Sequence, residues 1–427
     1  MENLYQVLSE RGFVEQVTDE ALLRDLLSAG PVTGYIGFDP TAASLHIGHL
    51  VPIMGLAHMF RAGHRPIALV GGGTGLIGDP SGKTEMRQVL TREQIDYNAS
   101  CLKAQLSQYI DFSPGKAILQ NNADWLTRLN YIEFLRDIGR HFSVNRMLAA
   151  ESYRSRLEKG LNFIEFNYML LQAYDFLHLY RREGCLFQLG GNDQWGNMLA
   201  GVDLIRRQEG VMAHCLTFPL LTTASGHKMG KTEKGAIWLD ASQTTAYDYY
   251  QYWVNTEDAD VQKFLALFTF LPMDEVRRTG ELRDQGLNMA KTVLAYEATR
   301  ITHGEETARA AWRATAQAFG SRPVPPGLYP SSSIPREDAA RDFSALPTLL
   351  WPRAELTAGI PACELFFQGG LCASKGEAKR LLGQGGGYVG ERQIRSFDEI
   401  IKMDDADEQG RIRLRKGKKK YLVVQAG

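Results

Sequence analysis

The sequence predicts an α/β fold in which a doubly wound parallel sheet is followed by a helical domain and a small α+β domain. Two apolar runs, at residues 67–70 and 186–189, end in glycines, as buried parallel strands that lead into loops do. Helical patterns lie around residues 45–60, 131–147 and 163–180, and helices that alternate with buried strands are typical of a doubly wound sheet. Residues 1–30 indicate short helices, and residues 247–319 indicate a helical region without convincing strands.

Length, composition and charge predict the domain organisation. A chain of 427 residues, 44% of them hydrophobic, is expected to form about two to four domains. Four prolines and four serines within residues 321–333 indicate a linker. Residues 351–427 contain 14 Lys and Arg against 10 Asp and Glu, so this tail has a net charge of +4 and the rest of the chain −5. A basic tail on an acidic body indicates a polyanionic partner.

Several classes of protein are not expected from this composition. The five cysteines include no Cys-x-x-Cys pair, so neither a disulfide framework nor a structural zinc site is predicted, and a reducing compartment is expected. The first residues lack a basic region followed by an apolar one, so no signal peptide is predicted. No apolar run approaches the ~20 residues that a membrane span requires. We therefore expect a cytoplasmic protein without a membrane partner.

The first candidate site is the segment 35–49, which leads from a short strand through a turn into a helix that Ser44 can cap. His46 and His49 are three residues apart and share a face of the first helical turn. At a helix N-terminus, two imidazoles can donate hydrogen bonds to a phosphoryl group, and Gly48 leaves room for a flat base. The alternative is two partly exposed histidines that cap a helix.

The second candidate site is the run Lys228-Met229-Gly230-Lys231-Thr232, which lies about 180 residues further on in a polar, glycine-bearing stretch. Two lysines three residues apart on a mobile loop can neutralise a leaving pyrophosphate. The alternative is a solvated basic turn.

The pair of motifs resembles the two signatures of class I aminoacyl-tRNA synthetases in order and spacing, with Gly230 and Thr232 in place of two serines as in the tyrosine branch. The resemblance implies a Rossmann-type catalytic domain at residues 1–225 with a helical insertion near 125–185. It implies a helical anticodon-side domain with the lysine motif at 226–320, a linker at 321–350, and an RNA-binding domain at 351–427. The implied reaction activates L-tyrosine with ATP to tyrosyl-adenylate and pyrophosphate, then transfers tyrosine to the 3′-terminal ribose of tRNA(Tyr).

A third candidate site selects the amino acid. Tyr168, Gln172 and Asp175 occupy one face of a predicted helix whose other residues are apolar, and a buried polar row of this kind needs hydrogen-bond partners. The resemblance to bacterial tyrosyl-tRNA synthetases implies that Tyr168 and Gln172, helped by Asp79, hold the ammonium group of tyrosine. It also implies that Asp175 and Tyr35 meet the phenolic hydroxyl. The alternative is an internal hydrogen-bond network of structural value only.

A glycine-rich run, residues 190–197, follows the second predicted strand, and ligands of open α/β sheets bind beyond such strand ends. The resemblance implies that Asp193 binds the ribose of ATP and that Gln194 lies beside the tyrosine carboxylate. The ATP site is expected to comprise Asp39, His46, Gly48, His49, Asp193 and Lys231. Magnesium is expected to accompany ATP without a dedicated protein metal site. A connecting turn without a ligand is the alternative.

The glycine-rich segment 71–87 carries two misleading patterns. Gly73, Gly75 and Gly78 match a dinucleotide fingerprint, but Pro80 and Gly82 indicate a loop where that motif requires a helix. Residues 82–84 imitate a phosphate-binding P-loop, but its first glycine would fall on Ile77. The resemblance implies a mobile lid instead, from which Lys83 and Arg87 reach the triphosphate. An exposed basic loop is the alternative.

The tail carries its own signature. Ser374 and Glu377 predict a capping box, and residues 411–416 alternate basic and apolar like a strand with one basic face. This resembles the small RNA-binding domain that ends bacterial tyrosyl-tRNA synthetases. A solvated charge run is the alternative. The expected tRNA contacts, mostly to phosphate, are Lys375, Lys379, Arg380, Arg415, Lys418, Lys419 and Lys420.

Three rival functions remain to be weighed. A tryptophanyl-tRNA synthetase is disfavoured by Tyr35 with Asp175, because an indole has no hydroxyl at that place. An NAD-dependent oxidoreductase would leave the histidine and lysine motifs unexplained. An RNA-binding protein with an inactive synthetase fold is disfavoured by the intact His46, His49, Lys228 and Lys231. The family also implies a homodimer, with residues 131–147 a candidate interface helix.

Overall fold

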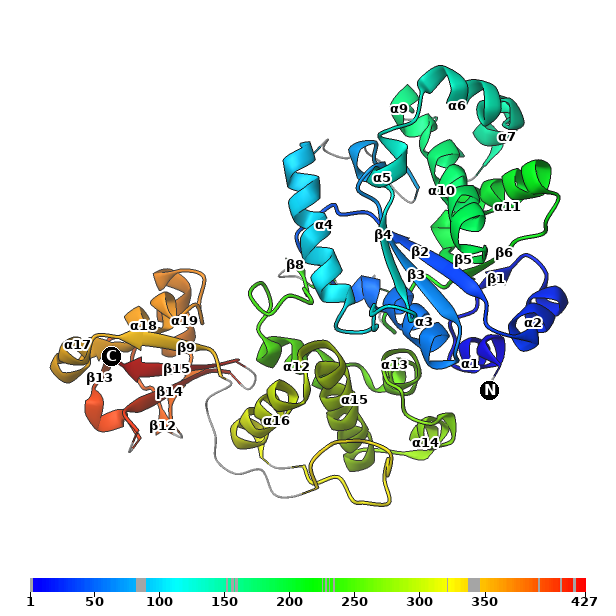
Figure 1. Cartoon of the computed structure of the whole chain (residues 1–427). Helices are drawn as coiled ribbons and strands as arrows, with labels where there is room; N and C mark the ends of the chain where they lie inside the picture. Colours follow the sequence, from blue (N-terminus) through cyan, green and yellow to red (C-terminus); the bar gives the residue numbers. More distant parts are fainter. Residues whose placement is uncertain are drawn as a thin grey trace.

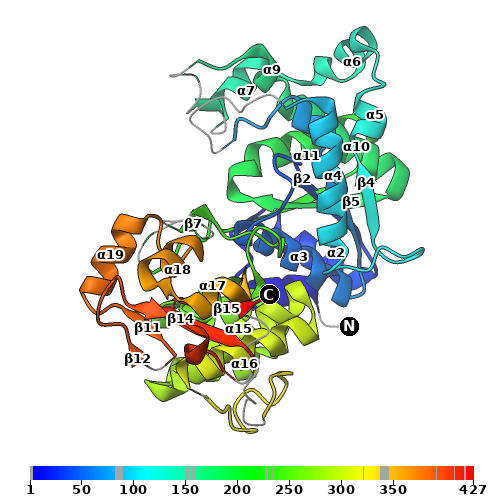
Figure 2. The same cartoon turned by 90° about the vertical axis from the view of Figure 1, so that its left-hand side faces the viewer.

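A computed structural model describes residues 3–427 except 82–89, 151–152, 155–156, 158–159, 225, 227–228, 230, 233–234, 321, 337–345, 391, 408 and 418–419. For residues 231–232 it describes the backbone alone. Figures 1 and 2 show three regions along the chain: a sheet region in blue to green, a helical region in yellow-green, and a C-terminal region in orange and red. Among the described helices, none combines the length and the apolar character that crossing a membrane requires.

The sheet region contains the predicted doubly wound sheet. Its six strands lie in the order β1-β6-β5-β2-β3-β4, and all neighbouring pairs are parallel except β1 with β6. The two predicted apolar runs lie within β3 and β5. The strand bounds are β1 (Gln16–Val17), β2 (Thr33–Phe38), β3 (Arg65–Val70), β4 (Ile118–Asn121), β5 (Cys185–Gly191) and β6 (His214–Phe218).

Helices cover both faces of this sheet (Figure 1). Alternate strand residues point to opposite sides, so Tyr35 and Ile67 pack with one set of helices and Ile36 and Ala68 with the other. The first face is covered by α10 (Tyr168–Glu183) and α11 (Trp195–Glu209), and the second by α3 (Leu50–Arg61). Further helices of this region are α1 (Leu4–Glu10), α2 (Glu20–Ala29) and α4 (Arg92–Leu106).

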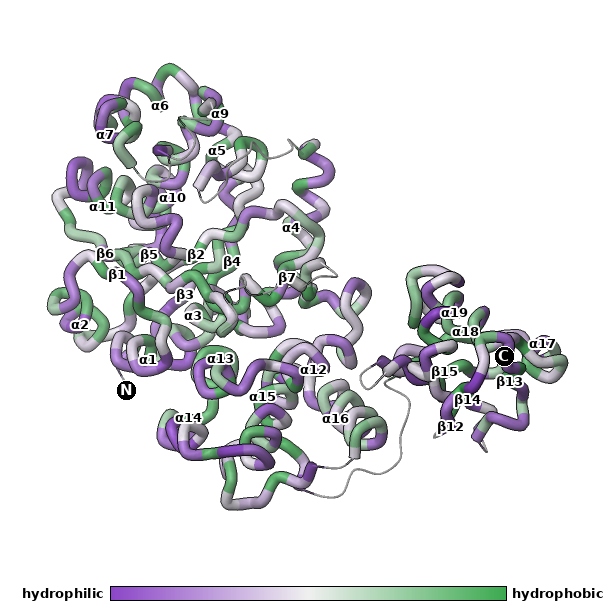
Figure 3. The backbone as a smooth tube through the Cα atoms, turned by 180° about the vertical axis from the view of Figure 1, so that it is seen from behind, coloured by the Kyte–Doolittle hydropathy of each residue, from purple (hydrophilic) through white to green (hydrophobic). Residues whose placement is uncertain are grey.

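The insertion between β4 and β5 is helical but more broken than its periodicity predicts. The pattern at residues 131–147 corresponds to α6 (Tyr131–Asp137), one 3-10 turn η3 (Gly139–His141) and α7 (Val144–Ala149). Gly139 lowers helix propensity and Ser143 takes the extended N-cap conformation, so the helix stops and restarts. Two further helices are α5 (Ala123–Leu126) and α9 (Phe163–Phe166). In Figure 3 the tube of α6 carries hydrophobic green segments beside purple ones.

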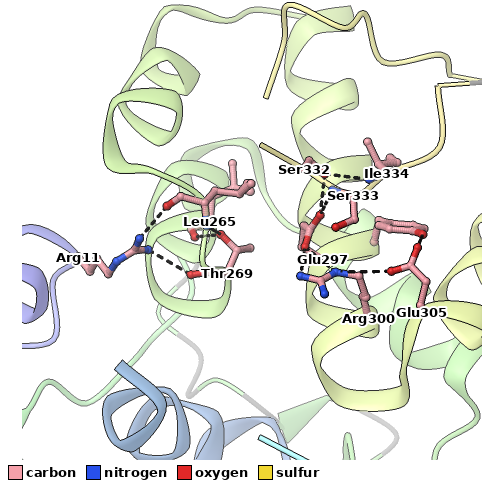
Figure 4. Close-up of polar contacts among 11 residues, drawn as sticks. Arg11, Leu265, Thr269, Glu297, Arg300, Glu305, Ser332, Ser333 and Ile334 are labelled. Atoms are coloured by element: carbon pink, nitrogen blue, oxygen red, sulfur yellow. Dashed lines mark hydrogen bonds and ion pairs between the residues drawn. The ribbon is translucent and has the colours of Figure 1, made fainter. Parts of the chain in front are cut away.

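Residues 247–319 are helical, as predicted, and this helical region contains five α-helices. The helical region is joined to the sheet region by Arg11, which follows α1. The Arg11 guanidinium donates to the carbonyls of Ala266 (2.9 Å), Thr269 (3.1 Å) and Leu271 (2.7 Å), as Figure 4 shows in part. A cation at the carboxyl end of a helix satisfies carbonyls that lack partners within the helix. The bounds are α12 (Ala246–Val254), α13 (Val261–Phe268), α14 (Met273–Arg278), α15 (Gln285–His303) and α16 (Glu305–Phe319).

Part of the predicted linker is packed against this region. Buried Glu297 of α15 accepts hydrogen bonds from Ser332 Oγ and Ser333 N–H, both at 2.7 Å, and pairs with Arg300 (Figure 4). Arg336 donates to four carbonyls of residues 324–329. Residues 322–336 therefore form a compact loop on α14 and α15.

The C-terminal region is a small α+β unit with its own core. Its five-stranded sheet has the order β12-β11-β14-β15-β9, and β9 is parallel to β15. Tyr421 links it to the helical region by donating to the carbonyl of Ala318 (2.6 Å) and packing edge-on against Phe319. The main elements are β9 (Thr348–Trp351), α17 (Arg353–Ala358), α18 (Ala362–Gln368), α19 (Lys375–Gly383), β11 (Gly387–Val389), β12 (Arg392–Gln393), β14 (Arg411–Lys416) and β15 (Lys420–Ala426).

Candidate functional site

The two histidines of the first motif lie side by side where one 3-10 turn, η1 (Ile47–His49), enters α3. His46 Nδ1 accepts a hydrogen bond from the N–H of Gly48 (3.0 Å), and His49 Nδ1 accepts one from the N–H of His46 (3.2 Å). Their ring centroids are 4.1 Å apart. Because each Nδ1 is an acceptor, a neutral ring carries its proton on Nε2, from which it can donate to an anion.

The prediction that Ser44 caps this helix is wrong, because the side chain of His46 occupies the N-cap. Ser44 Oγ instead donates to the carbonyl of Leu45 (2.8 Å) and accepts from the N–H of Asp240 (3.2 Å). A second requirement for glycine at position 48, besides room for a base, is the close approach of the His46 ring. A Cβ at this position would lie 2.8 Å from Cε1 of His46.

The lysine motif ends in a β-hairpin where a loop was expected. Lys231–Thr232 form β7, which pairs antiparallel with β8 (Gly235–Ala236). Lys228 lies outside the described residues, as do Lys83 and Arg87 of the predicted lid, and the side chains of Lys231 and Thr232 are not described.

The chain beyond this hairpin runs beside the histidine motif. The N–H of Ile47 donates to the carbonyl of Ile237 (2.9 Å), and the N–H of Leu239 donates to the carbonyl of Leu45 (2.8 Å). The backbone ladder therefore joins the histidine motif to residues 237–239, which directly follow the hairpin that contains Lys231 and Thr232.

A cavity of about 1000 Å³ adjoins both motifs. Its walls include His46, His49 and Met229, and also Asp193 from the turn η4 (Asn192–Gln194) at the carboxyl end of β5. Ligands of open parallel sheets bind at this edge, and a helix start with two imidazoles can bind phosphate there. Among the described residues, no three His, Cys, Asp or Glu side chains come together as a metal site would require.

Tyr35 and Asp175 lie together between the sheet and α10, both almost fully buried. The carboxylate of Asp175 accepts hydrogen bonds from Asn122 Nδ2 (2.8 Å) and Trp125 Nε1 (2.7 Å). The buried hydroxyl of Tyr35 has no hydrogen-bond partner within the described part of the chain. Such a hydroxyl is unfavourable until a ligand pairs with it.

Burial changes the acidity of two carboxyl groups in this region. Desolvation raises the pKa of Asp175 to about 7, although the hydrogen bonds from Asn122 and Trp125 act in the opposite direction. Desolvation likewise raises the pKa of Asp79 to about 6, against hydrogen bonds from Ser81 and Gln194. Both pKa values therefore lie near neutral pH, so a modest change of pH alters the charge of each carboxyl group.

The remaining predicted tyrosine-site residues are joined by hydrogen bonds. Gln194 donates to Asp79 (2.6 Å), Tyr168 donates to Asp39 (2.9 Å), and Asn197 donates to Gln172 (3.1 Å). Other side chains thus bond to each residue of the polar row of α10. Among the predicted tyrosine-site residues that the structure describes, Tyr35 has a buried side-chain oxygen without a partner.

In its described part, residues 71–81, the glycine-rich segment after β3 forms no helix that could present a dinucleotide fingerprint. Only one 3-10 turn, η2 (Thr74–Leu76), lies between Gly71 and Ser81. The N–H groups of Gly72 and Gly73 donate to Asn121 Oδ1 (3.1 Å) and Asn122 Oδ1 (2.7 Å), so these donors are used within the protein.

The basic face predicted for the tail is confirmed in β14, where Ile412 and Leu414 are buried and the intervening arginines face the other side. Ser374 Oγ caps α19 by accepting a hydrogen bond from the N–H of Glu377 (3.1 Å). In a capping box the Glu377 carboxylate would accept from the N–H of Ser374, but here it accepts from the N–H of Ala373.

The predicted contact residues of the tail lie around these two elements. Lys375 pairs with Glu364 at 2.7 Å. Lys379 and Arg380 are exposed on α19, and Arg415 stacks on Tyr388 at 3.7 Å. Lys420 begins β15, whereas Lys418 and Lys419 lie outside the described residues.

Sequence analysis missed two residues that hold the Asp175 carboxylate. Asn122 also donates to Thr74 Oγ1 (3.0 Å), and Trp125 stacks on His178 with ring centroids 4.2 Å apart. A single Asn and a single Trp beside a strand end form no periodic pattern, so no local signal identified them.

Comparison with known proteins agrees with this geometry. The family model described as tRNA synthetases class I (W and Y) matches residues 27–320. A tyrosine–tRNA ligase of Syntrophus aciditrophicus is 64% identical over 425 residues, covering 100% of this chain and 99% of the relative. One from Desulfatibacillum aliphaticivorans is 60% identical over 98% of this chain and 97% of the relative.

Among solved structures, a C-terminally truncated mitochondrial tyrosyl-tRNA synthetase of Aspergillus nidulans superimposes with a TM-score of 0.67 at 31% sequence identity. The match covers 75% of this chain and 95% of that one.

Proposed function

We infer the reaction of this chain from its family: it belongs to the bacterial-type tyrosine–tRNA ligases, a branch of the class I tRNA synthetases. It is a ligase that joins tyrosine to tRNA in protein synthesis. The tyrosine carboxylate attacks the α-phosphate of ATP, and pyrophosphate leaves. The 3′-terminal ribose hydroxyl of tRNA(Tyr) then attacks the carbonyl carbon of the tyrosyl-adenylate, and AMP leaves, with no covalent enzyme intermediate.

The meeting of the histidine and lysine motifs at one cavity supports our assignment of the activation step. We propose that His46 and His49 donate from Nε2 to the phosphates as their charge grows. Lys228 and Lys231 would neutralise the leaving pyrophosphate, and the hydroxyl of Thr232 would donate a hydrogen bond to it. Lys83 and Arg87 would reach the triphosphate from a lid. Such groups act by positioning and charge stabilisation.

For the other parts of ATP, we propose that Asp193 binds the ribose, while Gly48 and Asp39 complete the nucleotide site. Mg²⁺ would arrive with ATP, held chiefly by its phosphate oxygens.

Tyrosine selection is assigned to the buried pair Tyr35 and Asp175. The unpaired Tyr35 hydroxyl and the Asp175 acceptor offer two hydrogen bonds to a phenol, and phenylalanine can make neither. Asn122 and Trp125 would hold the carboxylate in place by their donated hydrogen bonds.

The ammonium group of tyrosine would displace protein hydrogen bonds at Tyr168, Gln172 and Asp79, with Gln194 beside the carboxylate.

The tail is proposed to bind tRNA mainly through phosphate contacts, which give affinity with steep salt dependence. The basic face of β14 and the exposed cations of α19 support this role. The contacts would be made by Lys375, Lys379, Arg380, Arg415, Lys418, Lys419 and Lys420.

A homodimer is proposed through the insertion. On α6, Tyr131, Ile132 and Leu135 are 58%, 70% and 37% exposed, and a group of exposed apolar side chains on one short helix is typical of an interaction surface. A cytoplasmic location is proposed because the substrates of protein synthesis are found there.

The function is tested directly by measuring the exchange of pyrophosphate into ATP in the presence of each of the twenty amino acids in turn. Exchange with tyrosine alone is expected. Exchange with tryptophan would favour the rival synthetase, and no exchange with any amino acid would favour an inactive RNA-binding protein.

A further inference from the structure

The segment that enters the histidine motif, residues 43–45, is held from two sides. On one side, the N–H of Leu239 donates to the carbonyl of Leu45 (2.8 Å), and the N–H of Asp240 donates to Ser44 Oγ (3.2 Å). On the other side, the amide of Gln105 from α4 takes the place of a neighbouring strand. Its Oε1 accepts from the N–H of Leu45 (2.9 Å), and its Nε2 donates to the carbonyl of Ala43 (3.5 Å).

Gln105 is 7% exposed, so its amide and the backbone groups that it meets are shielded from water. A buried N–H that loses its acceptor is strongly unfavourable, and a short segment responds by moving until the group is paired again. Leu45 directly precedes His46, whose N–H is bonded to His49. Movement of Leu45 would therefore carry both imidazoles with it.

Gln105 does not belong to the walls of the cavity formed by the described residues. Among the described residues, its link to the histidine motif is the segment that it holds. Misplacement of catalytic groups by about 1 Å, even from a distant change, can lower a rate by about 100-fold.

We propose that Gln105 is a positioning residue for tyrosine activation. It fixes the register of residues 43–45 against residues 239–240, and so sets where His46 and His49 meet the phosphates of ATP. The inference rests on the proposed function, and it adds a residue of α4 that touches no substrate.

Two substitutions separate the hydrogen bonds of Gln105 from the rest of its side chain. Gln105→Met keeps the length and removes both the acceptor and the donor. Gln105→Glu keeps an oxygen for the N–H of Leu45 and, in the protonated form that burial favours, a donor for the carbonyl of Ala43. Gln108→Met is the matched control, because Gln108 is exposed just beyond the end of the same helix. The measurements are tyrosine-dependent pyrophosphate exchange at saturating substrates, the equilibrium affinity for tyrosine, and thermal unfolding.

Gln105→Met is expected to lower the maximal exchange rate about 10- to 100-fold while tyrosine affinity stays within about 2-fold. Gln105→Glu should recover much of the rate, and Gln108→Met should match the wild type. If Gln105→Met does not fold, Gln105→Asn makes the same comparison, since its shorter side chain withdraws the acceptor and should slow exchange similarly.

If the wild type exchanges normally, three results would overturn the inference. They are an unchanged exchange rate in folded Gln105→Met, a loss of tyrosine affinity as large as the loss of rate, and no recovery of the rate in Gln105→Glu. A wild-type protein without tyrosine-dependent exchange would refute the proposed function and this inference together.

Discussion

The ionisation of Asp175 should make tyrosine selection depend on pH. Its pKa is raised to about 7 by burial. An ionised carboxylate accepts the hydrogen bond of a phenol better than a protonated one, and phenylalanine offers no such hydrogen. We therefore expect the affinity for tyrosine, relative to phenylalanine, to rise between pH 5.5 and pH 8.

The size of this effect follows from the ionised fraction. A group with a pKa of about 7 is about 3% ionised at pH 5.5 and about 90% ionised at pH 8. If only the ionised form accepts the phenol, the ratio of the two affinities should change by up to about 30-fold, because apparent affinity scales with the competent fraction. Asp79 also titrates in this range, but it would face the ammonium group that both amino acids share.

The assay is equilibrium binding of tyrosine and phenylalanine at four pH values, on the wild type and on Asp175→Asn. The variant should select tyrosine weakly, with a ratio that stays flat across the range. A constant ratio in the wild type, or the same pH dependence in Asp175→Asn, would refute this reasoning.

The same group should affect stability with a defined sign. Its folded pKa lies above the ordinary value of 3.8, so between these two values the folded protein holds a proton that the unfolded chain has lost. Stability contributed by Asp175 should therefore fall as pH rises from about 4 to 7, by at most about 4 kcal/mol. The free energy of unfolding of the ligand-free protein can be measured with urea at pH 5 and at pH 8. Its difference between the two pH values should be smaller in Asp175→Asn than in the wild type.

Three further substitutions or deletions test the other assignments. Tyr35→Phe should erode discrimination between tyrosine and phenylalanine while thermal unfolding stays normal, and unchanged selectivity would contradict the proposed pocket. A site built to hydrogen-bond a hydroxyl can reject the analogue without it by about 10⁵-fold, and tyrosine against phenylalanine is the known case in this family. Lys231→Ala should slow adenylate formation far more than it weakens tyrosine binding, and the reverse pattern in single-turnover and binding assays would assign the lysine to ground-state binding. Deletion of residues 351–427 should spare pyrophosphate exchange and cripple tRNA charging, whereas equal losses in both assays would mean that the tail supports the catalytic fold.

Local chemistry in the sequence was enough to identify the histidine and lysine motifs, the polar row of α10 and the basic tail. His46 and His49 are three residues apart, so a single helical turn brings their side chains together. The apolar runs in β3 and β5 indicated buried strands because a strand buried on both faces needs apolar side chains throughout. Such signals lie within a few consecutive residues.

Tertiary structure alone decided which distant residues complete the site. Several hydrogen bonds join residues 50 or more positions apart in the sequence. They link Leu239 to Leu45, Leu45 to Gln105, and both Asn122 and Trp125 to Asp175. Each contact uses a backbone group or a single polar side chain, which leaves no periodicity along the chain. The free energy of such a bond depends on burial and on the partner's position, and both are set only when the chain has folded.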